Sequence, residues 1–189
     1  MKARTAMAIV VASGGITLAS VPLMNHLSMA EDGGKRRPVY ADKLAGGLPT
    51  ACLGITKHVS PYPVVIGEVW SEARCVEVGA LVVRKQQLAL ADCITRVVPQ
   101  DVFDALTSHG HNLGIPNTCA SRAVALINQG RMAEGCDAIA HAPDGKTPVW
   151  SYVKTARLLP NGKYEMRFVQ GLYNRRLAER AMCLRGVAK

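Results

Sequence analysis

The sequence predicts an α+β domain that is mainly helical and has a small β region in its first third. Apolar residues make up 49% of the 189 residues, which is enough for one hydrophobic core. The stretch 33–63 is rich in Gly, Pro, Thr and Tyr with short β-favouring runs, whereas apolar residues recur at three-and-four spacing after residue 66. Composition and the absence of a repeat exclude disordered and fibrous proteins, and one apolar run excludes a multi-pass membrane protein.

The first thirty residues differ from the rest of the chain. Two basic residues precede an uncharged run from Thr5 to Ala30, which is long enough to cross a hydrocarbon core of ~30 Å. Gly14 and Gly15 interrupt the run and weaken its insertion. A cleaved signal peptide, an uncleaved signal anchor and a buried helix of a cytosolic protein are the three interpretations. The abrupt onset of charge at Glu31 favours the two that export the remainder.

The β region is expected between residues 33 and 63, with one strand-forming run at Pro49–Thr56. A stripe of apolar residues then predicts an amphipathic helix from Glu68 to about Arg96, with a break allowed near Gly79. Pro99 opens the next helix, which runs through Ser108. The β region is therefore followed by helices that share one core.

Shorter elements complete the helical part. Asn117 or Thr118 is expected to cap a helix that Gly130 closes. The stretch 141–164 is predicted to be loose, with turns at Pro143-Asp144-Gly145 and Pro160-Asn161-Gly162. A last helix is predicted from about Leu172 to Leu184.

The cysteines predict disulfide bonds and not a metal site. All of them follow the apolar run, and their spacing is too wide for a zinc ligand set. Up to three disulfides in an oxidising compartment are expected, with the pairing open and buried free thiols as the alternative. His109 and His111 have no neighbouring ligand cluster, which favours a surface or capping role. We expect no metal and no cofactor. The six are Cys52, Cys75, Cys93, Cys119, Cys136 and Cys183.

Carboxylates with suitable chemistry lie where the apolar run meets the β region. Glu31 ends the helical run directly before two glycines, where an apolar flank and the negative end of the helix dipole favour a protonated carboxyl. Asp42 lies in the first β-favouring segment, and Thr50, eight residues later, has a hydroxyl that can hold a water beside it. An acid and a second carboxylate are the pair that glycosidic bond hydrolysis needs, with Asp32 as a further candidate.

The order of these motifs resembles that of bacteriophage-type lysozymes, glycoside hydrolase family 24. The resemblance covers about residues 31–186. Segments of this chain resemble the family's motifs Glu-Gly, Tyr-x-Asp, Thr-x-x-x-Gly-x-Thr, Asn-x-Gly and Gly-Leu-x-x-Arg-Arg-x-x-Glu. The matching segments are Glu31–Arg36, Tyr40–Asp42, Leu48–Thr56, Asp104–Gly114, Ser121–Gly130 and Gly171–Glu179.

The resemblance implies a lysozyme-like fold, a cleft between a small β lobe and a helical lobe, and a role for each matching residue. The implied reaction is hydrolysis of the β-1,4 bond between N-acetylmuramic acid and N-acetylglucosamine in peptidoglycan. Glu31 would be the general acid, Asp42 would act on the water or the developing oxocarbenium ion, and Thr50 would position water. Arg175 would pair with the acid, and Asn112 would either touch the substrate or end its helix.

One spacing departs from the family. Counting back from Tyr40, the family's acid falls on Gly33, so a short insertion is needed to place Glu31 there. Asp32 is the substitute acid. A third possibility is that no acid is present, in which case the protein would be a non-catalytic peptidoglycan-binding or inhibitory protein on a lysozyme scaffold.

The leader resembles the signal-anchor-release segments of some phage-type lysozymes. We expect residues 1–30 to be a signal-anchor or signal-peptide segment and 31–189 the catalytic domain. The protein would be exported to the host inner membrane and periplasm, associate transiently with the inner membrane, act on peptidoglycan glycan strands as a monomer, and cause host cell lysis. The net charge of +9 favours polyanions, but export and the cysteines argue against nucleic acid.

Overall fold

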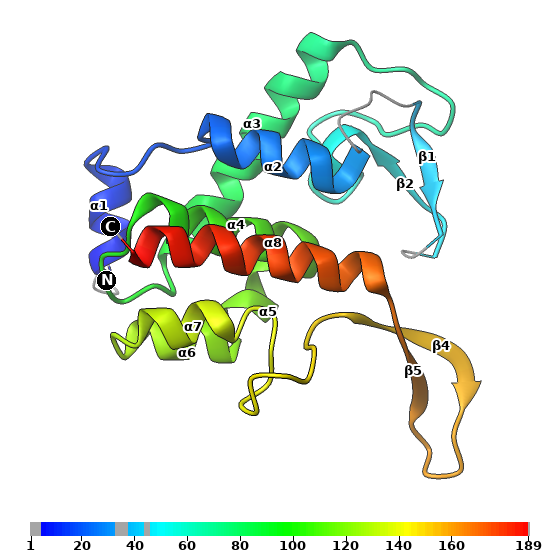
Figure 1. Ribbon diagram of the computed structural model, residues 1–189. Coiled ribbons are helices and arrows are strands. Elements are labelled where there is room, and N and C mark those ends of the chain that lie inside the picture. The colour runs from blue at the N-terminus through cyan, green and yellow to red at the C-terminus, as the bar shows by residue number, and fades with distance from the viewer. Residues whose placement is uncertain (1–4, 33–37, 44–45, 189) are drawn as a thin grey trace.

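A computed structural model describes residues 5–32, 38–43 and 46–188, with the side chain of Asp32 outside the description. It confirms the predicted α+β class: helices form most of the body, a short antiparallel sheet lies in the order β1-β2-β3, and a separate hairpin, β4-β5, projects from the body (Figure 1). The elements are α1 Ala6–Ala12, α2 Val21–Asp32, β1 Tyr40–Asp42, β2 Leu48–Ala51, η1 Cys52–Gly54, β3 Ile55–Thr56, α3 Glu72–Ala91, α4 Gln100–Leu113, α5 Ile115–Cys119, α6 Arg122–Asn128, α7 Met132–Asp137, β4 Tyr152–Leu158, β5 Tyr164–Phe168 and α8 Gln170–Val187.

Helix α4 lies at the centre of the body. Every residue from Val102 to Gly110 is buried, and α4 packs against α8, α3, α5 and α2. Around it the apolar side chains form a large core, and a second, smaller core joins α2 and α3 to the β sheet. Since buried apolar area is the main source of stability, α4 is the element on which the other helices depend for their packing.

The leader is folded into these cores as two helices. Thr5 caps α1 by accepting a hydrogen bond from the amide of Ala8 at 3.1 Å, and a bend over residues 13–20 separates α1 from α2. Met7 and Val11 are buried in the large core, whereas Leu23 and Leu27 are fully buried in the smaller one. Among the described residues, no helix has the length and apolar character needed to span a bilayer.

Helix α3 is shorter than predicted at both ends and is continuous. Ser71 caps it by accepting a hydrogen bond from the amide of Arg74, so it begins at Glu72; it ends at Ala91 and not near Arg96, and the break allowed near Gly79 does not occur. Instead, Gly79 lets η1 approach the helix, because a Cβ there would lie 2.3 Å from Leu53 Cδ1. The glycine therefore serves contact with the β lobe.

The later elements confirm some boundaries and correct others. The cap assigned to Asn117 or Thr118 is wrong, since both lie inside α5 and Ser121 caps α6. Gly130 follows α6 as expected, and α8 lies within a few residues of its prediction. The stretch predicted to be loose contains β4 and β5, which pair through the register Tyr152↔Phe168. The alternation of apolar and charged residues over Tyr164–Phe168 was the strand signal that the prediction missed.

All six cysteines are paired. The bonds join Cys52 with Cys75, Cys93 with Cys119, and Cys136 with Cys183, at Cα–Cα distances of 5.8, 5.7 and 5.4 Å. The first links η1 to α3, the second links the end of α3 to α5, and the third links α7 to α8. The prediction of three disulfides is thus confirmed, and the free-thiol alternative is wrong.

We predict that the native exported protein loses six hydrogens in mass relative to its reduced form. Loss of a single bridge should lower the free energy of unfolding by about 2–5 kcal/mol, because the unfolded chain regains freedom. Intact mass under reducing and non-reducing conditions checks the first point, and urea unfolding of the Cys136→Ser/Cys183→Ser variant checks the second. Native protein with titratable thiols would contradict the pairing.

Candidate active site

Glu31 and Arg175 meet at the centre of the candidate site. Glu31 lies in the last turn of α2 and Arg175 in the second turn of α8, and the Nη1 of Arg175 forms an ion pair with Oε1 of Glu31. The side chains are 17% and 7% exposed, so the carboxylate is sheltered but reachable. Gly54 closes over it with φ +69°, and a Cβ there would lie 2.8 Å from Glu31 Oε2. Only glycine permits the β lobe to approach the carboxylate this closely.

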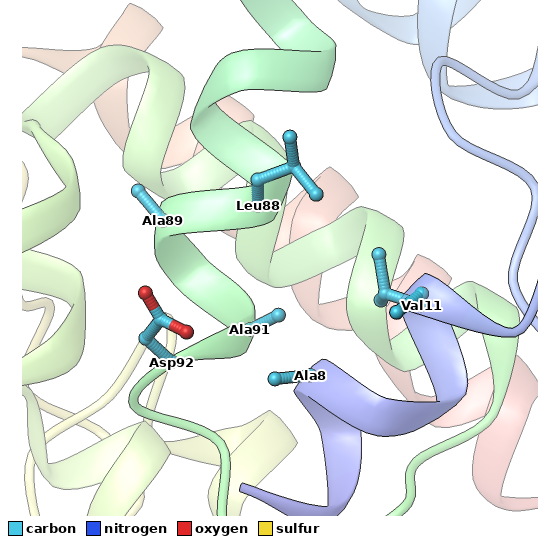
Figure 2. A pocket seen from close by; sticks show the side chains of 7 residues that line it. Ala8, Val11, Leu88, Ala89, Ala91 and Asp92 are labelled. Carbon is cyan, nitrogen blue, oxygen red and sulfur yellow. The ribbon is translucent and has the colours of Figure 1, made fainter. Parts of the chain in front are cut away.

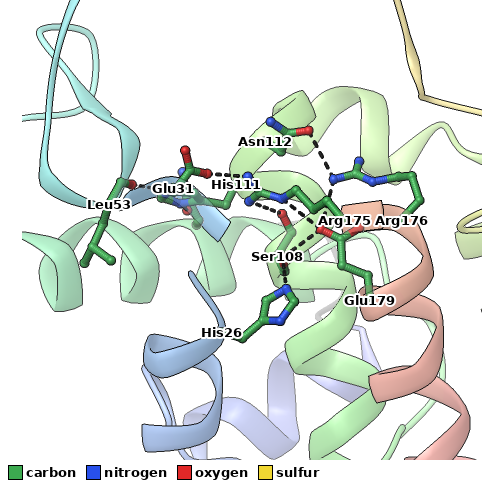
Figure 3. A network of polar contacts seen from close by, with 10 residues as sticks. His26, Glu31, Leu53, Ser108, His111, Asn112, Arg175, Arg176 and Glu179 are labelled. Atoms are coloured by element: carbon green, nitrogen blue, oxygen red, sulfur yellow. Dashed lines mark hydrogen bonds and ion pairs between the residues drawn. The ribbon is translucent and has the colours of Figure 1, made fainter. Parts of the chain in front are cut away.

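A buried polar network holds Arg175 in place (Figure 3). Its Nε donates to Oε1 of Glu179 at 3.2 Å, and the hydroxyl of Ser108 donates to the same oxygen at 2.7 Å. Because that hydroxyl hydrogen is used, the Ser108 oxygen accepts from Nε2 of His26 at 3.1 Å. The network therefore joins α2, α4 and α8 around one guanidinium group.

The network contains buried charges of both signs, and burial shifts the pKa values of several of these groups. Oε1 of Glu179 also accepts a hydrogen bond from Nη2 of Arg176 at 3.0 Å, so one carboxylate pairs with two guanidinium groups. Burial raises the pKa of Glu179, and the two arginines oppose that rise. Burial also lowers the pKa of Arg176 to about 10 and, together with the arginines, lowers the pKa of His26. A neutral His26 adds no third positive charge near Arg175.

Asp42 and Thr50 lie on the same face of the β sheet. Tyr40 pairs with Thr50 and Asp42 with Leu48, so Asp42 and Thr50 are diagonal neighbours on the two paired strands. Thr50 is buried and its Oγ1 donates to the carbonyl of Leu48 at 3.0 Å, which leaves its lone pairs to accept. η1, which carries Gly54, follows β2 directly in the chain and contacts α2, so the β lobe and the end of α2 are neighbours.

Asn112 supports the second arginine. Its Oδ1 accepts from Nη2 of Arg176 at 3.1 Å. The helix-ending interpretation of Asn112 is wrong, because α4 continues to Leu113 and Gly114 caps it. Contact of Asn112 with substrate stays a prediction. The side chain of Asp32, the substitute acid, and Gly33, the position at which the family spacing would place the acid, lie outside the described residues.

His109 is fully buried and His111 is half-buried, so the prediction of a surface or capping role is wrong for His109. His109 bonds Thr118 at 2.8 Å, and burial lowers its pKa to about 3. His111 bonds the carbonyl of Leu53 at 2.6 Å and Gln86 at 2.8 Å, which ties η1 to the helical body. No group of three His, Cys, Asp or Glu side chains capable of holding a metal occurs within the described ranges.

The sequence reasoning missed Glu179, Ser108 and His26. A signal for Glu179 was present, because its spacing of four from Arg175 and three from Arg176 places the three side chains on one helix face. Ser108 and His26 carry no such signal, since they come from other helices.

We predict that Glu179→Gln strongly destabilises the fold. The variant keeps the shape of the side chain but leaves two buried guanidinium groups with too little negative charge, which costs about 3–5 kcal/mol. Urea unfolding measures the loss. Glu134→Gln is the matched control, since Glu134 forms an exposed ion pair with Arg131 and should change stability little. Equal stability of the two variants would show that Glu31 alone balances the arginines.

Comparison with known proteins agrees with this geometry. The Phage lysozyme family model matches residues 30–179. A SAR-endolysin of Pseudomonas phage phiKMV is 31% identical over 153 residues, covering 80% of each chain. An endolysin structure from the Escherichia coli O157:H7 phage FAHEc1 superposes with a TM-score of 0.67 at 23% identity, covering 89% of this chain and 93% of that one. The muramidase domain of SpmX from Asticaccaulis excentricus superposes with a TM-score of 0.67 at 20% identity, covering 87% of this chain and 96% of that one. The chain therefore belongs to the phage lysozyme family of glycoside hydrolases.

Proposed function

We propose that Glu31, Asp42 and Thr50 carry out the muramidase reaction of this phage lysozyme, which hydrolyses the β-1,4 bond between N-acetylmuramic acid and N-acetylglucosamine in peptidoglycan. The observation that supports this assignment most directly is the partly buried ion pair between Glu31 and Arg175 under the Gly54 turn. It supplies one sheltered carboxyl group at the junction of the β lobe and the helical body.

Glu31 is the proton donor in this proposal. Arg175 holds Oε1 and fixes the orientation of the carboxyl group, so Oε2 is the oxygen that carries the proton to the glycosidic oxygen. The remaining exposure of Glu31 lets solvent restore the proton after each turnover.

Asp42 and Thr50 act on the water. The Thr50 oxygen accepts a hydrogen bond from that water, and Asp42, on the same sheet face, accepts a proton as the water attacks the anomeric carbon. Attack from the face opposite to the leaving group inverts the configuration of the sugar. Each proton is thus accounted for: one moves from Glu31 to the leaving oxygen and one moves from water to Asp42.

We predict that Glu31→Gln abolishes lysis of chloroform-treated Gram-negative cells while the protein stays folded. General acid catalysis contributes about 10²–10⁴ in rate, so the loss should be obvious in turbidity. Asp42→Asn and Thr50→Ala should each reduce turnover with little change in thermal stability. Asp32→Asn is the matched control.

The outcomes separate the alternatives. Full activity of Glu31→Gln with an inactive Asp32→Asn would move the acid by one residue. Activity in both variants would refute the carboxylate pair. Binding to cell walls without release of reducing sugar by the unsubstituted protein would favour the non-catalytic wall-binding alternative.

We infer, second, that the leader holds the protein at the host inner membrane until it is released and docks. The SAR-endolysin of phage phiKMV is a relative at 31% identity, and the run 5–30 is uncharged. Glu31 follows this run on α2, so a leader lying in the bilayer would keep Glu31 away from Arg175. Export, an inactive membrane form and a soluble active form follow from this proposal, whereas a cleaved signal peptide is its alternative.

Polar contacts hold the leader in its docked position. Ser20 donates to Asp104 Oδ2 at 2.6 Å while capping α2, and the amide of Ala19 donates to Gln87 at 2.7 Å. Gln100 bonds both the amide and the carbonyl of Thr17, at 2.9 and 3.0 Å. These contacts recognise the backbone of the bend between α1 and α2.

Packing of α1 is less complete than packing of α2. A hollow of about 250 Å³ lies between α1 and α3, lined by apolar residues and Asp92 (Figure 2). This hollow is open to solvent, so the sides of α1 and α3 that line it do not pack directly against each other there. Such packing suits a segment that exchanges between two environments. The lining residues are Ala8, Val11, Ala12, Leu88, Ala89, Ala91 and Asp92.

We predict that Ser13→Leu favours the inactive membrane form. Ser13 is exposed when the leader is docked and does not line the hollow between α1 and α3, so the added apolar surface strengthens insertion by about 0.5 kcal/mol without filling that hollow. Asp104→Asn is the complementary variant, since it leaves the leader unchanged and weakens only the docked form. Cell fractionation before and after an uncoupler, with immunoblotting for size, reads the outcome. A product shortened by about thirty residues at all times would mean a cleaved signal peptide.

A further inference from the structure

The β4-β5 hairpin presents an apolar face that no other part of the described chain covers. Tyr152, Tyr164, Met166 and Phe168 are 38%, 45%, 55% and 40% exposed. The register Tyr152↔Phe168 and Lys154↔Met166 places these side chains on the same face as Lys154, whose Nζ lies 3.5 Å from the centre of the Tyr164 ring. A two-stranded hairpin is only marginally stable by itself. Exposed apolar patches on a folded protein are typical of binding sites, so this face is a candidate binding surface.

Aromatic contacts connect this face to the body. Tyr152 and Phe168 meet edge to face at 5.6 Å, and Phe168 contacts Tyr173 of α8 at 5.8 Å. Tyr173 then bonds His141 at 3.0 Å, and His141 lines a hollow of about 210 Å³ together with Trp150. The aromatic surface is therefore continuous from the hairpin to the surface of the helical body.

The position of the hairpin relates it to the candidate active site. β5 ends at Phe168, two residues before α8 begins, and Arg175 in the second turn of α8 holds Glu31. Figure 1 shows the hairpin and the β1-β2 lobe projecting from the end of the body where α8 begins. A polymer bound at Glu31 thus passes within reach of the hairpin.

The charge of the hairpin points to an anionic polymer. Lys154 lies on the apolar face and Lys163 directly precedes β5, whereas on the opposite face the charge of Arg157 is paired with that of Glu165. Aromatic rings stack on the apolar faces of sugar rings, and the cations suit the carboxylates of muramic acid stem peptides. The exposed aromatic rings and the cations therefore both fit one ligand, a glycan strand that carries carboxylates.

We propose that the apolar face of the β4-β5 hairpin binds the peptidoglycan glycan strand outside the cleavage site. This proposal rests on the muramidase function and names an additional substrate contact. The hairpin supplies affinity for the polymer and takes no part in bond cleavage, so its loss raises KM for intact walls and leaves kcat on a short soluble glycan unchanged.

The test uses Tyr164→Thr/Met166→Thr in a chain that carries Glu31→Gln. Threonine keeps the strand propensity, and the Tyr152–Phe168 pair stays to hold the hairpin. Arg157→Thr/Glu165→Thr on the opposite face is the matched control, because it also preserves net charge. Circular dichroism and the thermal midpoint check that both variants are folded.

Sedimentation with purified Gram-negative sacculi should show about tenfold weaker binding for Tyr164→Thr/Met166→Thr and no change for the control. In the active background, the same pair should cleave a short soluble glycan at the unsubstituted rate. Equal binding of all three proteins to sacculi would overturn the proposal. Loss of binding to vesicles of phosphatidylethanolamine and phosphatidylglycerol, with sacculus binding retained, would overturn it in favour of a membrane contact. Cleavage by Glu31→Gln itself would refute the catalytic assignment and leave the binding result readable.

Discussion

The structure depends on one guanidinium group that two carboxylates share. Arg175 contacts Glu31 from α2 on one side and Glu179 from its own helix on the other. A buried guanidinium without a countercharge costs several kcal/mol, so the position of α8 and the position of α2 are coupled. The catalytic candidate and the packing of the helical body therefore cannot be changed independently.

Because of this coupling, the leader contributes both to the packing of the protein and to the candidate active site. Its apolar side chains complete both cores, and its last turn delivers Glu31 to Arg175. The residues that make the proposed membrane segment apolar are thus the same residues that are buried in the folded protein. Gln87 and Gln100, which lie beside Asp104, add a geometric requirement, because they bond the backbone of the bend between α1 and α2.

The sequence allowed prediction of the features that rest on local pattern. The helix stripe, the glycine that follows α6 and the Tyr-x-Asp segment gave α3, the end of α6 and β1 close to their observed positions. Prediction failed where the controlling partner is distant in sequence. Gly79 looked like a helix break because Leu53, which it accommodates, lies 26 residues earlier, and His109 looked exposed because its partner Thr118 belongs to another helix.

The β4-β5 hairpin was also missed by the prediction, but for a different reason. β5 alternates Tyr164, Met166 and Phe168 with Glu165 and Arg167, so the sequence carried a strand signal that the prediction overlooked beside the flanking turn residues. An apolar face that packs on nothing in its own chain lowers the stability of the monomer unless a ligand covers it. For an enzyme that acts on an insoluble polymer, weak contacts of this kind have a clear use, since several of them hold the enzyme at the surface without slowing release from any one bond.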